Sequence, residues 1–377
     1  MEYLRLKDVC DINMGQSPTS DSYNDAGDGV PFFQGNADFG DRYPITRKWC
    51  NAPTKMAQPG DILISVRAPI GAINYAKEEC CIGRGLAAVT PDRDKVSPDF
   101  VFWFLKGKKE ELNSKGTGST FKAISRKVLE EILVPNVDLK EQSKYAEILE
   151  KIYFVQKSQK QELKYLDDLI KARFVEMFGD PIKNPKGWKV VTIGDVVTEV
   201  RYGTSKPAVE GGKYPYLRMN NLTVEGHLDL NDLKYIDISD DEIEKCVVRK
   251  GDVLFNRTNS IELVGKTAVF DLSEDMVIAG YIIRVRLNER LLPEILSQYM
   301  NLEALKDILR SMAKGAVNQA NINAQELQSI KVYVPGMELQ KQFIEIKEQI
   351  DKSKSAVQKA LNETQMLFDS LMQEYFG

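Results

Sequence analysis

The feature that most constrains the fold is a long amphipathic stretch that occurs twice, at residues 141–179 and again at 338–377. Both copies close on an aromatic motif, in which Phe178 matches Phe376 at an offset of 198 residues. Apolar residues recur every three or four positions, with no proline or glycine before the final Gly. This periodicity predicts a long helix with one apolar stripe. One copy would fit ordinary core packing, but two copies predict helices that pair with each other.

We predict that the two helices meet along a seam of apolar side chains. We expect the seam to be least regular near Gln159, which interrupts the apolar pattern. A helix of about 38 residues spans roughly 57 Å at 1.5 Å per residue. The predicted seam consists of Ile148, Ile152, Leu163, Leu166, Ile170, Phe174, Ile346, Ile350, Val357, Leu361, Phe368 and Met372.

The composition allows large cores and excludes several classes of site. The chain has 377 residues, of which 43% are hydrophobic, enough for two or more domains. Its five cysteines form no Cys-x-x-Cys pair, and His227 is the only histidine. These facts argue against a zinc site, exclude a histidine metal cluster, and require any Ser-His-Asp site to use His227. Free thiols and the absence of an apolar run of membrane-spanning length predict a cytoplasmic protein without a membrane partner.

The charge balance does not by itself indicate a nucleic-acid-binding protein. The formal net charge is −4 and the isoelectric point is about 5.5. Acidic residues crowd the two amphipathic stretches and residues 237–244. Basic residues can therefore still gather on one face of each globular block.

Short motifs recur in the same order ahead of each amphipathic stretch, which indicates a tandem duplication. The matched motifs are Pro59-Gly60-Asp61 with Lys250-Gly251-Asp252, Pro98 with Pro293, the loop at Lys115 with that at Lys314, and Val134-Pro135 with Val334-Pro335. The offset drifts, as insertions in surface loops would cause. After the last motif we match Gln142 with Gln342 at an offset of 200. The difference from 198 predicts that the two helices do not begin in the same register.

The predicted fold class is α+β, with two tandem mixed α/β units separated by two long helices packed as an antiparallel coiled coil. We place the first globular unit at residues 1–138 and its helix at 139–180. A linker rich in proline follows at 181–187. The second globular unit then occupies 188–337 and the second helix 338–377.

No set of residues assembles into a catalytic motif. Gly265-Lys266-Thr267 imitates the end of a phosphate-binding loop, but Ser260 stands where that motif needs glycine, and the following residues favour a strand. The chain lacks an Asn-Pro-Pro-aromatic or Asp-Pro-Pro-aromatic run. Pro91-Asp92 and Pro98-Asp99 fit a turn and a helix start better than a nuclease motif. We therefore predict a non-enzyme with no cofactor and no metal of its own.

The remaining polar signals favour binding to DNA. Small residues in the loops at Lys115 and Lys314 free backbone N–H groups for phosphate, while amides and arginines beside strands can pair with base edges. For any one residue, a solvated loop or an internal hydrogen bond is an equally good interpretation. The candidate DNA-binding residues are Gln34, Asn36, Arg67, Arg84, Lys115, Thr117, Ser119 and Lys122, followed by Arg218, Asn220, Asn221, Arg257, Lys314, Asn318, Gln319 and Asn321.

The duplicated order of Gly-Asp strand, basic glycine-rich loop, Val-Pro, Leu-x-x-Gln and long helix resembles the specificity (S) subunits of type I restriction–modification systems. The resemblance covers essentially the whole chain. The first copy keeps the family's Glu-Gln at Glu141-Gln142, whereas the matched position in the second copy has Lys341-Gln342.

The resemblance implies that each globular unit is a target-recognition domain for one half of an asymmetric, bipartite sequence in double-stranded DNA. It implies that the helices hold the two units apart and so set the spacer. From the helix length of roughly 57 Å, with the domains set inward from the ends, we expect half-site centres about 10 base pairs apart. Two methyltransferase subunits would dock on the assembly, and restriction subunits would join through them. S-adenosylmethionine, ATP and Mg²⁺ would then be bound only by those partners.

Two alternatives from other classes remain open at this point. A coiled-coil adaptor that binds only proteins would explain the helices and the acidic charge without DNA. An autonomous nuclease or methyltransferase would need a catalytic site that the sequence does not display.

Overall fold

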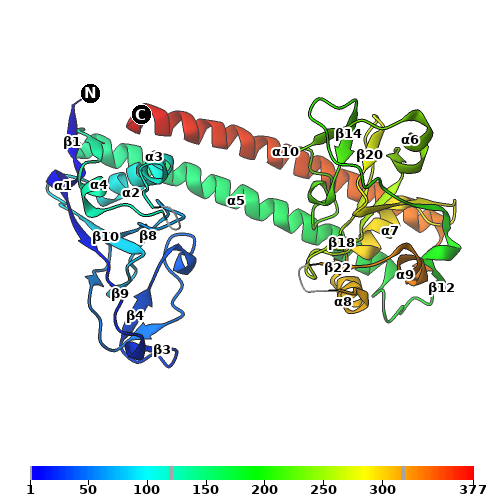
Figure 1. Ribbon diagram of the computed structural model, residues 1–377, viewed down its shortest axis with the longest axis horizontal. Helices are drawn as coiled ribbons and strands as arrows, with labels where there is room; N and C mark the ends of the chain where they lie inside the picture. Colours follow the sequence, from blue (N-terminus) through cyan, green and yellow to red (C-terminus); the bar gives the residue numbers. More distant parts are fainter. Residues whose placement is uncertain (1, 119–121, 316–318) are drawn as a thin grey trace. The chain divides into compact units, whose positions relative to one another are not determined.

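The structure is a computed structural model that describes residues 2–118, 122–315 and 319–377. The chain divides into two compact units: unit 1 is Met1–Lys160 with Lys359–Gly377, and unit 2 is Gln161–Gln358. The division cuts both long helices, so each unit contains part of each (Figure 1). No helix in the described part of the chain is both long enough and apolar enough to cross a bilayer.

Unit 1 is built on a four-stranded antiparallel sheet in the order β2-β10-β7-β8 and a five-stranded sheet in the order β3-β5-β4-β9-β6. Its strands are β1 (Tyr3–Arg5), β2 (Cys10–Met14), β3 (Tyr23–Asn24), β4 (Val30–Phe33), β5 (Trp49–Cys50), β6 (Met56–Ala57), β7 (Ile62–Ser65), β8 (Ile73–Tyr75), β9 (Cys80–Ile82), β10 (Leu86–Pro91) and β11 (Leu133–Pro135). Its short helices are α1 (Leu6–Val9), α2 (Pro98–Gly107), α3 (Lys109–Ser114) and α4 (Arg126–Glu130).

Unit 2 repeats this plan with the sheets β13-β21-β17-β19 and β15-β14-β20-β16. Its strands are β12 (Lys189–Thr192), β13 (Val197–Tyr202), β14 (Tyr214–Leu217), β15 (Lys234–Ile236), β16 (Val247–Val248), β17 (Val253–Asn256), β18 (Thr258–Asn259), β19 (Thr267–Val269), β20 (Met276–Ile278), β21 (Ile282–Leu287), β22 (Ala320–Asn321) and β23 (Lys331–Val334). Its short helices are α6 (Asp240–Cys246), α7 (Pro293–Met300), α8 (Glu303–Met312) and α9 (Ala324–Ser329).

The repeated Gly-Asp motif forms the turn that leads into the central strand of each main sheet. Gly60 and Gly251 adopt φ of +90° and +93°, a conformation that only glycine takes without strain. The following Asp61 accepts a hydrogen bond from the backbone N–H of Gln58 at 2.7 Å. In unit 2, Asp252 accepts the equivalent bond from Arg249 at 2.9 Å. The motif therefore fixes where β7 and β17 begin.

The two long helices are α5 (Leu139–Phe178) and α10 (Met337–Phe376), and they pack against each other (Figure 1). Their first residues and their last residues both differ by 198 positions. Contacts between them run in opposite directions along the two sequences, so the pair is antiparallel. These contacts are Tyr145–Tyr375 and Gln156–Gln365 in unit 1, and Asp167–Lys354 and Phe174–Phe343 in unit 2.

The predicted change of register at the helix start is wrong. Gln142 is buried, accepts from the backbone N–H of Ser97 at 2.8 Å, and donates to the Val137 carbonyl five residues earlier. In unit 2 the same bonds are made by Gln340, which accepts from Leu292 at 2.9 Å and donates to Pro335, again five residues earlier. Ser97 and Leu292 are the N-cap residues of α2 and α7. The counterpart of Gln142 is thus Gln340, at an offset of 198.

Each unit's core is completed by the end of the long helix that starts from the other globular block. In unit 1, Phe376 at the end of α10 is 3% exposed and packs edge-on against Phe100 of α2, with ring centroids 5.1 Å apart. In unit 2, Phe178 at the end of α5 is fully buried beside Phe343 of α10. Burial of one such ring stabilises the fold by about 1.5–3 kcal/mol. The matching aromatic ends found in the sequence are therefore core residues of both units.

The predicted seam positions are all at least partly buried in α5 and α10. Four of them are buried, namely Ile152, Ile170, Phe174 and Ile350. The others are half-buried: Ile148, Leu163, Leu166, Ile346, Val357, Leu361, Phe368 and Met372. A polar layer interrupts the seam, because Gln156 donates to Gln365 at 3.1 Å and Gln159 to Thr364 at 3.4 Å.

Candidate nucleic-acid interface

Unit 1 has an open hollow of about 210 Å³ at one edge of the β4–β9 strand pair. β4 and β9 are parallel, with Phe33 opposite Ile82, so the residues that follow each strand come out at the same edge. These residues are Gln34 and Asn36 after β4 and Arg84 after β9. Arg67, two residues beyond the end of β7, completes the polar lining. Four of the predicted DNA-binding residues therefore lie around one hollow.

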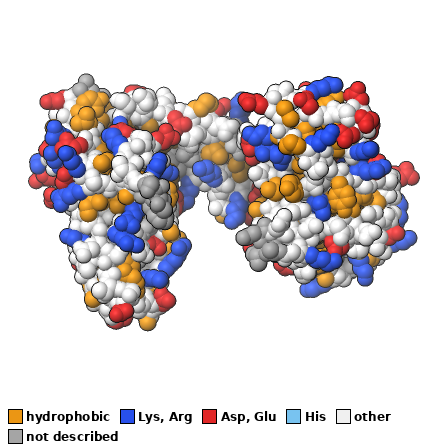
Figure 2. Space-filling view, viewed as in Figure 1, with side chains coloured by type: hydrophobic (Ala, Val, Ile, Leu, Met, Phe, Trp, Pro, Cys, Tyr) orange, Lys and Arg blue, Asp and Glu red, His pale blue; other side chains and the backbone are white. Residues whose placement is uncertain are grey.

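The backbone of this hollow is packed too closely for side chains at its glycines. A Cβ atom on Gly85 would stand 2.3 Å from the carbonyl oxygen of Gln34, a distance that no side chain tolerates. The side chains of Gln34, Arg67 and Arg84 are exposed. In Figure 2, Lys and Arg side chains are spread over the visible face of unit 1 and are not confined to one strand pair. The hollow thus presents amides and guanidinium groups to solvent from a rigid frame.

Unit 2 has the corresponding hollow, with a volume of about 600 Å³. β14 and β20 are parallel, with Leu217 opposite Ile278, so the chain again leaves both strands at one edge. Arg218, Asn220 and Arg257, three of the candidate DNA-binding residues, lie on its lining. The lining also includes Tyr281, which is 50% exposed and which the sequence analysis missed. The sequence signal that could have identified Tyr281 is a tyrosine directly after Ala279-Gly280, just beyond a strand.

Two arginines of this hollow are held in place by internal contacts. Arg218 pairs with Asp232 at 2.7 Å. Arg257 donates to the Gly280 carbonyl at 3.4 Å, and its guanidinium carbon lies 4.9 Å from the centre of the Tyr202 ring. The Nε atoms of both arginines are buried and have no partner among the described residues. Each guanidinium is therefore oriented by internal contacts, and its buried Nε is not accessible to a ligand.

The prediction that Asn221 contacts a base is wrong. Asn221 is 2% exposed, and both ends of its amide are used inside the protein. Its Oδ1 accepts from the backbone N–H of Arg218 and its Nδ2 donates to the Asp229 carbonyl, both at 2.8 Å. In unit 1, Asp38 accepts from the backbone N–H of Gln34 at 2.7 Å and so fulfils the same turn-forming role. Asn221 therefore shapes the loop that carries Arg218 and Asn220.

The structure pairs the residues of the two glycine-rich loops differently from the prediction, which matched the loop at Lys115 with that at Lys314. Thr117 forms a bridge with Ala123, and Lys314 forms the same kind of bridge with Asn321, so Lys314 takes the place of Thr117 rather than of Lys115. Asn321 also accepts from the Thr258 hydroxyl at 3.3 Å. The exposed candidates in these loops include Lys122 and Gln319. The candidates Ser119 and Asn318 lie outside the described residues.

The two loop lysines each have an acidic partner. Lys115, the C-cap residue of α3, pairs with Glu111 of that helix, and Lys314 pairs with Glu326 of α9. Hydrogen bonds from these ammonium groups lower the pKa of Glu111 and of Glu326. A phosphate would have to compete with these carboxylates for either lysine.

The motif that imitates a phosphate-binding loop has a structural role. Lys266 is buried and donates to the Met219 carbonyl at 2.7 Å, while Thr267 begins β19. Burial lowers the pKa of Lys266. Within the described residues, no group of three or more His, Cys, Asp or Glu side chains is placed to hold a metal ion.

Comparison with known families accounts for this duplicated frame. A model of the type I restriction–modification DNA specificity domain matches residues 1–171 and, a second time, residues 185–364. The chain belongs to the family of type I restriction–modification specificity subunits. Its two units are tandem recognition domains of that family.

Curated relatives carry the same description. The type I restriction enzyme MjaX specificity subunit of Methanocaldococcus jannaschii is 48% identical over 141 residues, which are 37% of this chain and 33% of the relative. The chain thus matches about a third of the length of that archaeal subunit. The EcoKI specificity subunit of Escherichia coli K12 is 23% identical over 339 residues, which are 84% of this chain and 73% of the relative.

Solved structures share the fold. The S subunit of a type I restriction–modification system from M. genitalium aligns over 100% of this chain and 96% of its own length, with a TM-score of 0.57 and 14% identity. A chain from a structural study of complex assembly and conformational transition in a type I system aligns over 100% of this chain and 97% of its own, with a TM-score of 0.60 and 20% identity.

Proposed function

We propose that this specificity subunit recognises an asymmetric bipartite sequence in double-stranded DNA, with each recognition domain contacting one half. The observation that carries the proposal is that both units place arginine and amide side chains around a hollow at the same strand edge. Arginine pairs with guanine and asparagine or glutamine with adenine in the major groove. The two hollows have different side chains, Gln34 and Arg84 in one and Arg218 and Arg257 in the other, so two different half-sites are expected.

The chain is proposed to be non-catalytic. Methylation and cleavage would be performed by partner subunits: two methyltransferase subunits that dock on the specificity subunit, and restriction subunits that join through them. S-adenosylmethionine, ATP and Mg²⁺ would be bound by those partners. The relatives are named as specificity subunits, which fits this division of labour.

The direct test is to co-express the chain with its neighbouring methyltransferase and to map the methylated bases by long-read sequencing. A bipartite motif is expected. Arg84→Gln should then relax only the half-site of the first domain and Arg257→Gln only that of the second, each with a loss of about 1–3 kcal/mol in discrimination. Relaxation of both half-sites by one substitution would contradict the assignment of one half to each domain.

The length of the helices is proposed to set the spacer between the half-sites. Removing seven residues from both α5 and α10 shortens each by about 10 Å, which corresponds to about 3 base pairs of duplex. We expect a shorter spacer in the methylation map. A deletion confined to one helix serves as the control, because it breaks the shared offset of 198 and should abolish activity. A spacer that keeps its length after the double deletion would rule out this role.

The loop lysines are proposed to contact phosphate. Replacing Lys115 or Lys314 with alanine should weaken binding to every DNA sequence and reduce the salt slope of the methyltransferase complex by about 1. Lys151, an exposed lysine of α5 paired with Glu147, is the matched control. An unchanged slope in both loop variants would remove these lysines from the interface.

A further inference from the structure

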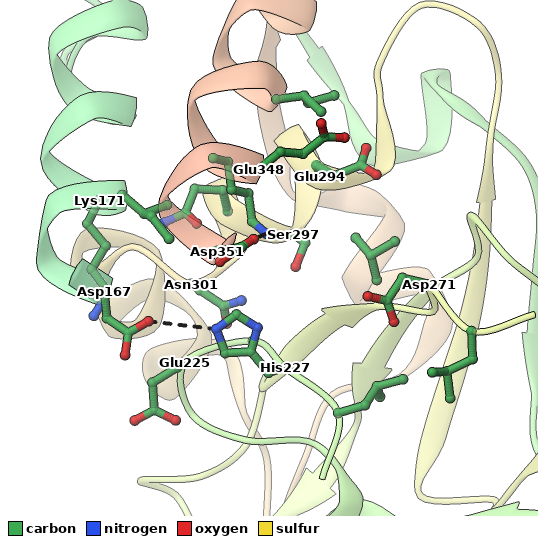
Figure 3. Close-up of a pocket in the computed structure, with 18 of the residues that line it drawn as sticks. Asp167, Lys171, Glu225, His227, Asp271, Glu294, Ser297, Asn301, Glu348 and Asp351 are labelled. Atoms are coloured by element: carbon green, nitrogen blue, oxygen red, sulfur yellow. Dashed lines mark hydrogen bonds and ion pairs between the residues drawn. The ribbon is translucent and has the colours of Figure 1, made fainter. Parts of the chain in front are cut away.

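Unit 2 contains a second, larger cavity that lies apart from the proposed DNA-binding residues. It has a volume of about 620 Å³ and is lined by α7, the first half of α10, the end of α5 and the loop around His227 (Figure 3). Carboxylates enter its wall from different elements, among them Glu294 of α7, Glu348 of α10 and Asp271 beyond β19. Lys171, Lys250 and Lys347 also line the cavity, but the carboxylates outnumber these lysines six to three, so the cavity has the size and the charge of a site for a small cationic group.

In unit 1 the equivalent place is filled by an arginine of the same chain. The guanidinium carbon of Arg42 lies 4.3 Å from the ring centre of Phe102, 5.1 Å from that of Tyr75 and 5.4 Å from that of Trp103. Its Nη2 pairs with Glu150 of α5 at 2.6 Å. A cation held between aromatic faces and one carboxylate is a stable arrangement.

The internal repeat shows which residues correspond. Tyr75 pairs with Ile62 after the first Gly-Asp turn, as Val269 pairs with Val253 after the second. Proline is the first residue of both α2 and α7, which fixes an offset of 195 there, and the long helices share the offset of 198. The counterparts are Val269 for Tyr75, Ser297 for Phe102, Gln298 for Trp103 and Glu348 for Glu150. Unit 2 has thus kept the carboxylate and replaced the aromatic walls with smaller or polar side chains.

Unit 2 has also lost the arginine itself. The loop of Arg42 is closed by a bridge between Phe39 and Pro44, and the equivalent loop by a bridge between Leu222 and Leu228. Arg42 lies two residues before Pro44, and Gly226 lies two residues before Leu228, so Arg42 corresponds to Gly226. A Cβ on Gly226 would stand 2.4 Å from the Asn301 side chain, so this position cannot supply a side chain. The loop of unit 2 therefore places no cationic side chain in the cavity at the position of Gly226.

The polar lining of this cavity is only partly satisfied within the protein: Asp167 pairs with Lys354 and Asp351 with Lys347, whereas other groups have no partner. Glu294, Glu348 and Asp271 form no ion pair with any cation in the described part of the chain. Gln298 is only 9% exposed and lines the cavity, yet its side-chain amide has no hydrogen-bond partner among the described residues. The amide atoms of Gln298 are open to the cavity, so they can form hydrogen bonds with a ligand there.

We propose that this cavity of unit 2 binds a guanidinium group from another molecule, in the place that Arg42 fills in unit 1. Glu348 would pair with the group as Glu150 does with Arg42, and Gln298 would accept a hydrogen bond from it. The guanidinium group arrives either on a free low-mass compound or on an arginine side chain of a polypeptide. This proposal does not depend on DNA recognition.

The test is a titration of the full chain with N-acetyl-L-argininamide, followed by ligand-observed NMR. We expect saturable binding with a dissociation constant on the order of 1 mM, as is usual for a ligand of this size. The matched probe is N-acetyl-L-citrullinamide, which has the same shape and no charge and should not bind. Equal binding of the two probes, or no saturable binding of the arginine probe, overturns the proposal.

Substitutions locate the binding in the chain. Glu348→Gln should reduce the affinity about tenfold or more, because one charge-assisted hydrogen bond is lost. Gln298→Trp, which restores the bulk of Trp103, should abolish binding. Asp168→Asn removes an exposed carboxylate of α5 outside the cavity wall and should leave the affinity unchanged. Normal affinity in Glu348→Gln, with the fold intact by circular dichroism, also overturns the proposal.

A second arm identifies the source of the group. Free L-arginine and 4-guanidinobutylamine represent a low-mass ligand, while the blocked argininamide represents a residue within a chain. Tighter binding of the free compounds assigns the cavity to a low-mass ligand. Tighter binding of the blocked residue, together with its displacement by an arginine-containing peptide, assigns it to a partner protein.

Discussion

The two units use the same backbone frame but fill the space between their long helices and the helix α2 or α7 in opposite ways. In unit 1 this space holds Trp103, Phe102 and Tyr75 around the Arg42 guanidinium. In unit 2 the equivalent space is a cavity walled by Gln298, Ser297 and carboxylates. The turns, sheet orders and glutamine caps that hold the frame are alike in both. The frame is therefore determined by a few backbone interactions, and the filling between its elements is free to diverge.

The test with the largest expected effect on stability is to truncate Trp103 in unit 1 and its counterpart Gln298 in unit 2. Trp103 is fully buried and contacts Tyr153 and Phe368 of the two long helices, so Trp103→Ala should cost about 3–5 kcal/mol. Gln298→Ala in unit 2 should cost less than about 1 kcal/mol, because no partner is lost. Urea unfolding combined with hydrogen exchange of peptides from each unit measures both. Similar costs for the two variants would show that the cavity is a packed part of the core.

The second test removes the cation that fills unit 1. Arg42→Met leaves Glu150 facing aromatic rings without its guanidinium partner, and we expect unit 1 to lose about 2 kcal/mol. The double variant Arg42→Met with Glu150→Gln should recover part of this loss, since the unpaired carboxylate is then gone. Unit-resolved hydrogen exchange separates the effect from unit 2. Lack of recovery in the double variant would assign the loss to packing alone.

Much of the frame could be predicted from the sequence because its signals are local or periodic. The amphipathic period predicted the bounds of both long helices to within a few residues, and the Gly-Asp turns predicted the strands β7 and β17. The register at the helix start could not be predicted, because it depends on Gln142 and Gln340 capping α2 and α7 from distant parts of the chain. A glutamine in a helix has no sequence mark that identifies it as the cap of another helix.

The candidate site was predicted in part, for a similar reason. Gln34, Asn36 and Arg84 come together because β4 and β9 are parallel, and a strand followed at once by polar residues is visible in the sequence. Asn221 looked equally suitable, but its amide closes the turn beneath Arg218. The direction of a side chain within a loop depends on backbone hydrogen bonds that no residue pattern reveals. The cavity of unit 2 was also missed, since it arises from residues that are absent relative to unit 1.

A third test compares two lysines with lowered pKa values, one half-buried in unit 1 and one buried in unit 2. Lys106 of unit 1 lies 4.3 Å from the Tyr153 ring centre, and burial lowers its pKa to about 8, with Arg42 contributing. Lys306 of unit 2 is 7% exposed and donates to the Gly265 carbonyl and to Asn301. Burial lowers the pKa of Lys306 further, to about 7, with Arg310 contributing.

A lowered lysine pKa means that the unfolded chain binds more protons than the folded one between the two pKa values. The stability of unit 2 should therefore rise with pH from about 7 towards 10, by up to about 1.4 kcal/mol per pH unit. Lys306→Met should remove this slope, whereas Lys7→Met, at an exposed lysine of unit 1, should keep it. The measurement is urea unfolding from pH 6 to 9.5. A slope that persists in Lys306→Met would mean that other groups cause it.

The smallest test exchanges the matched polar pairs of the helix seam. Asp167 of α5 pairs with Lys354 of α10 in unit 2, and the positions at offset 198 in unit 1 carry the neutral pair Gln365 and Gln156, which are hydrogen-bonded at 3.1 Å. Although burial alone would raise it, the pKa of Asp167 is lowered by the neighbouring His227 ring and by the Lys354 ammonium group, which donates a hydrogen bond to its carboxylate. The lowered pKa stabilises unit 2 above the normal range of an aspartate, near pH 4, and this contribution is lost as the pH falls further.

Asp167→Asn should therefore cost about 1 kcal/mol at pH 7 and progressively less as the pH falls below about 4. The double variant Asp167→Gln with Lys354→Gln transfers the neutral pair of unit 1 into unit 2. It should come within about 0.5 kcal/mol of the parent at pH 7, because a hydrogen-bonded amide pair replaces a partly exposed ion pair whose Coulomb gain is offset by desolvation. A loss in the double variant as large as in Asp167→Asn would mean that the seam distinguishes the two halves by charge, and that the ion pair fixes which segments of α5 and α10 meet.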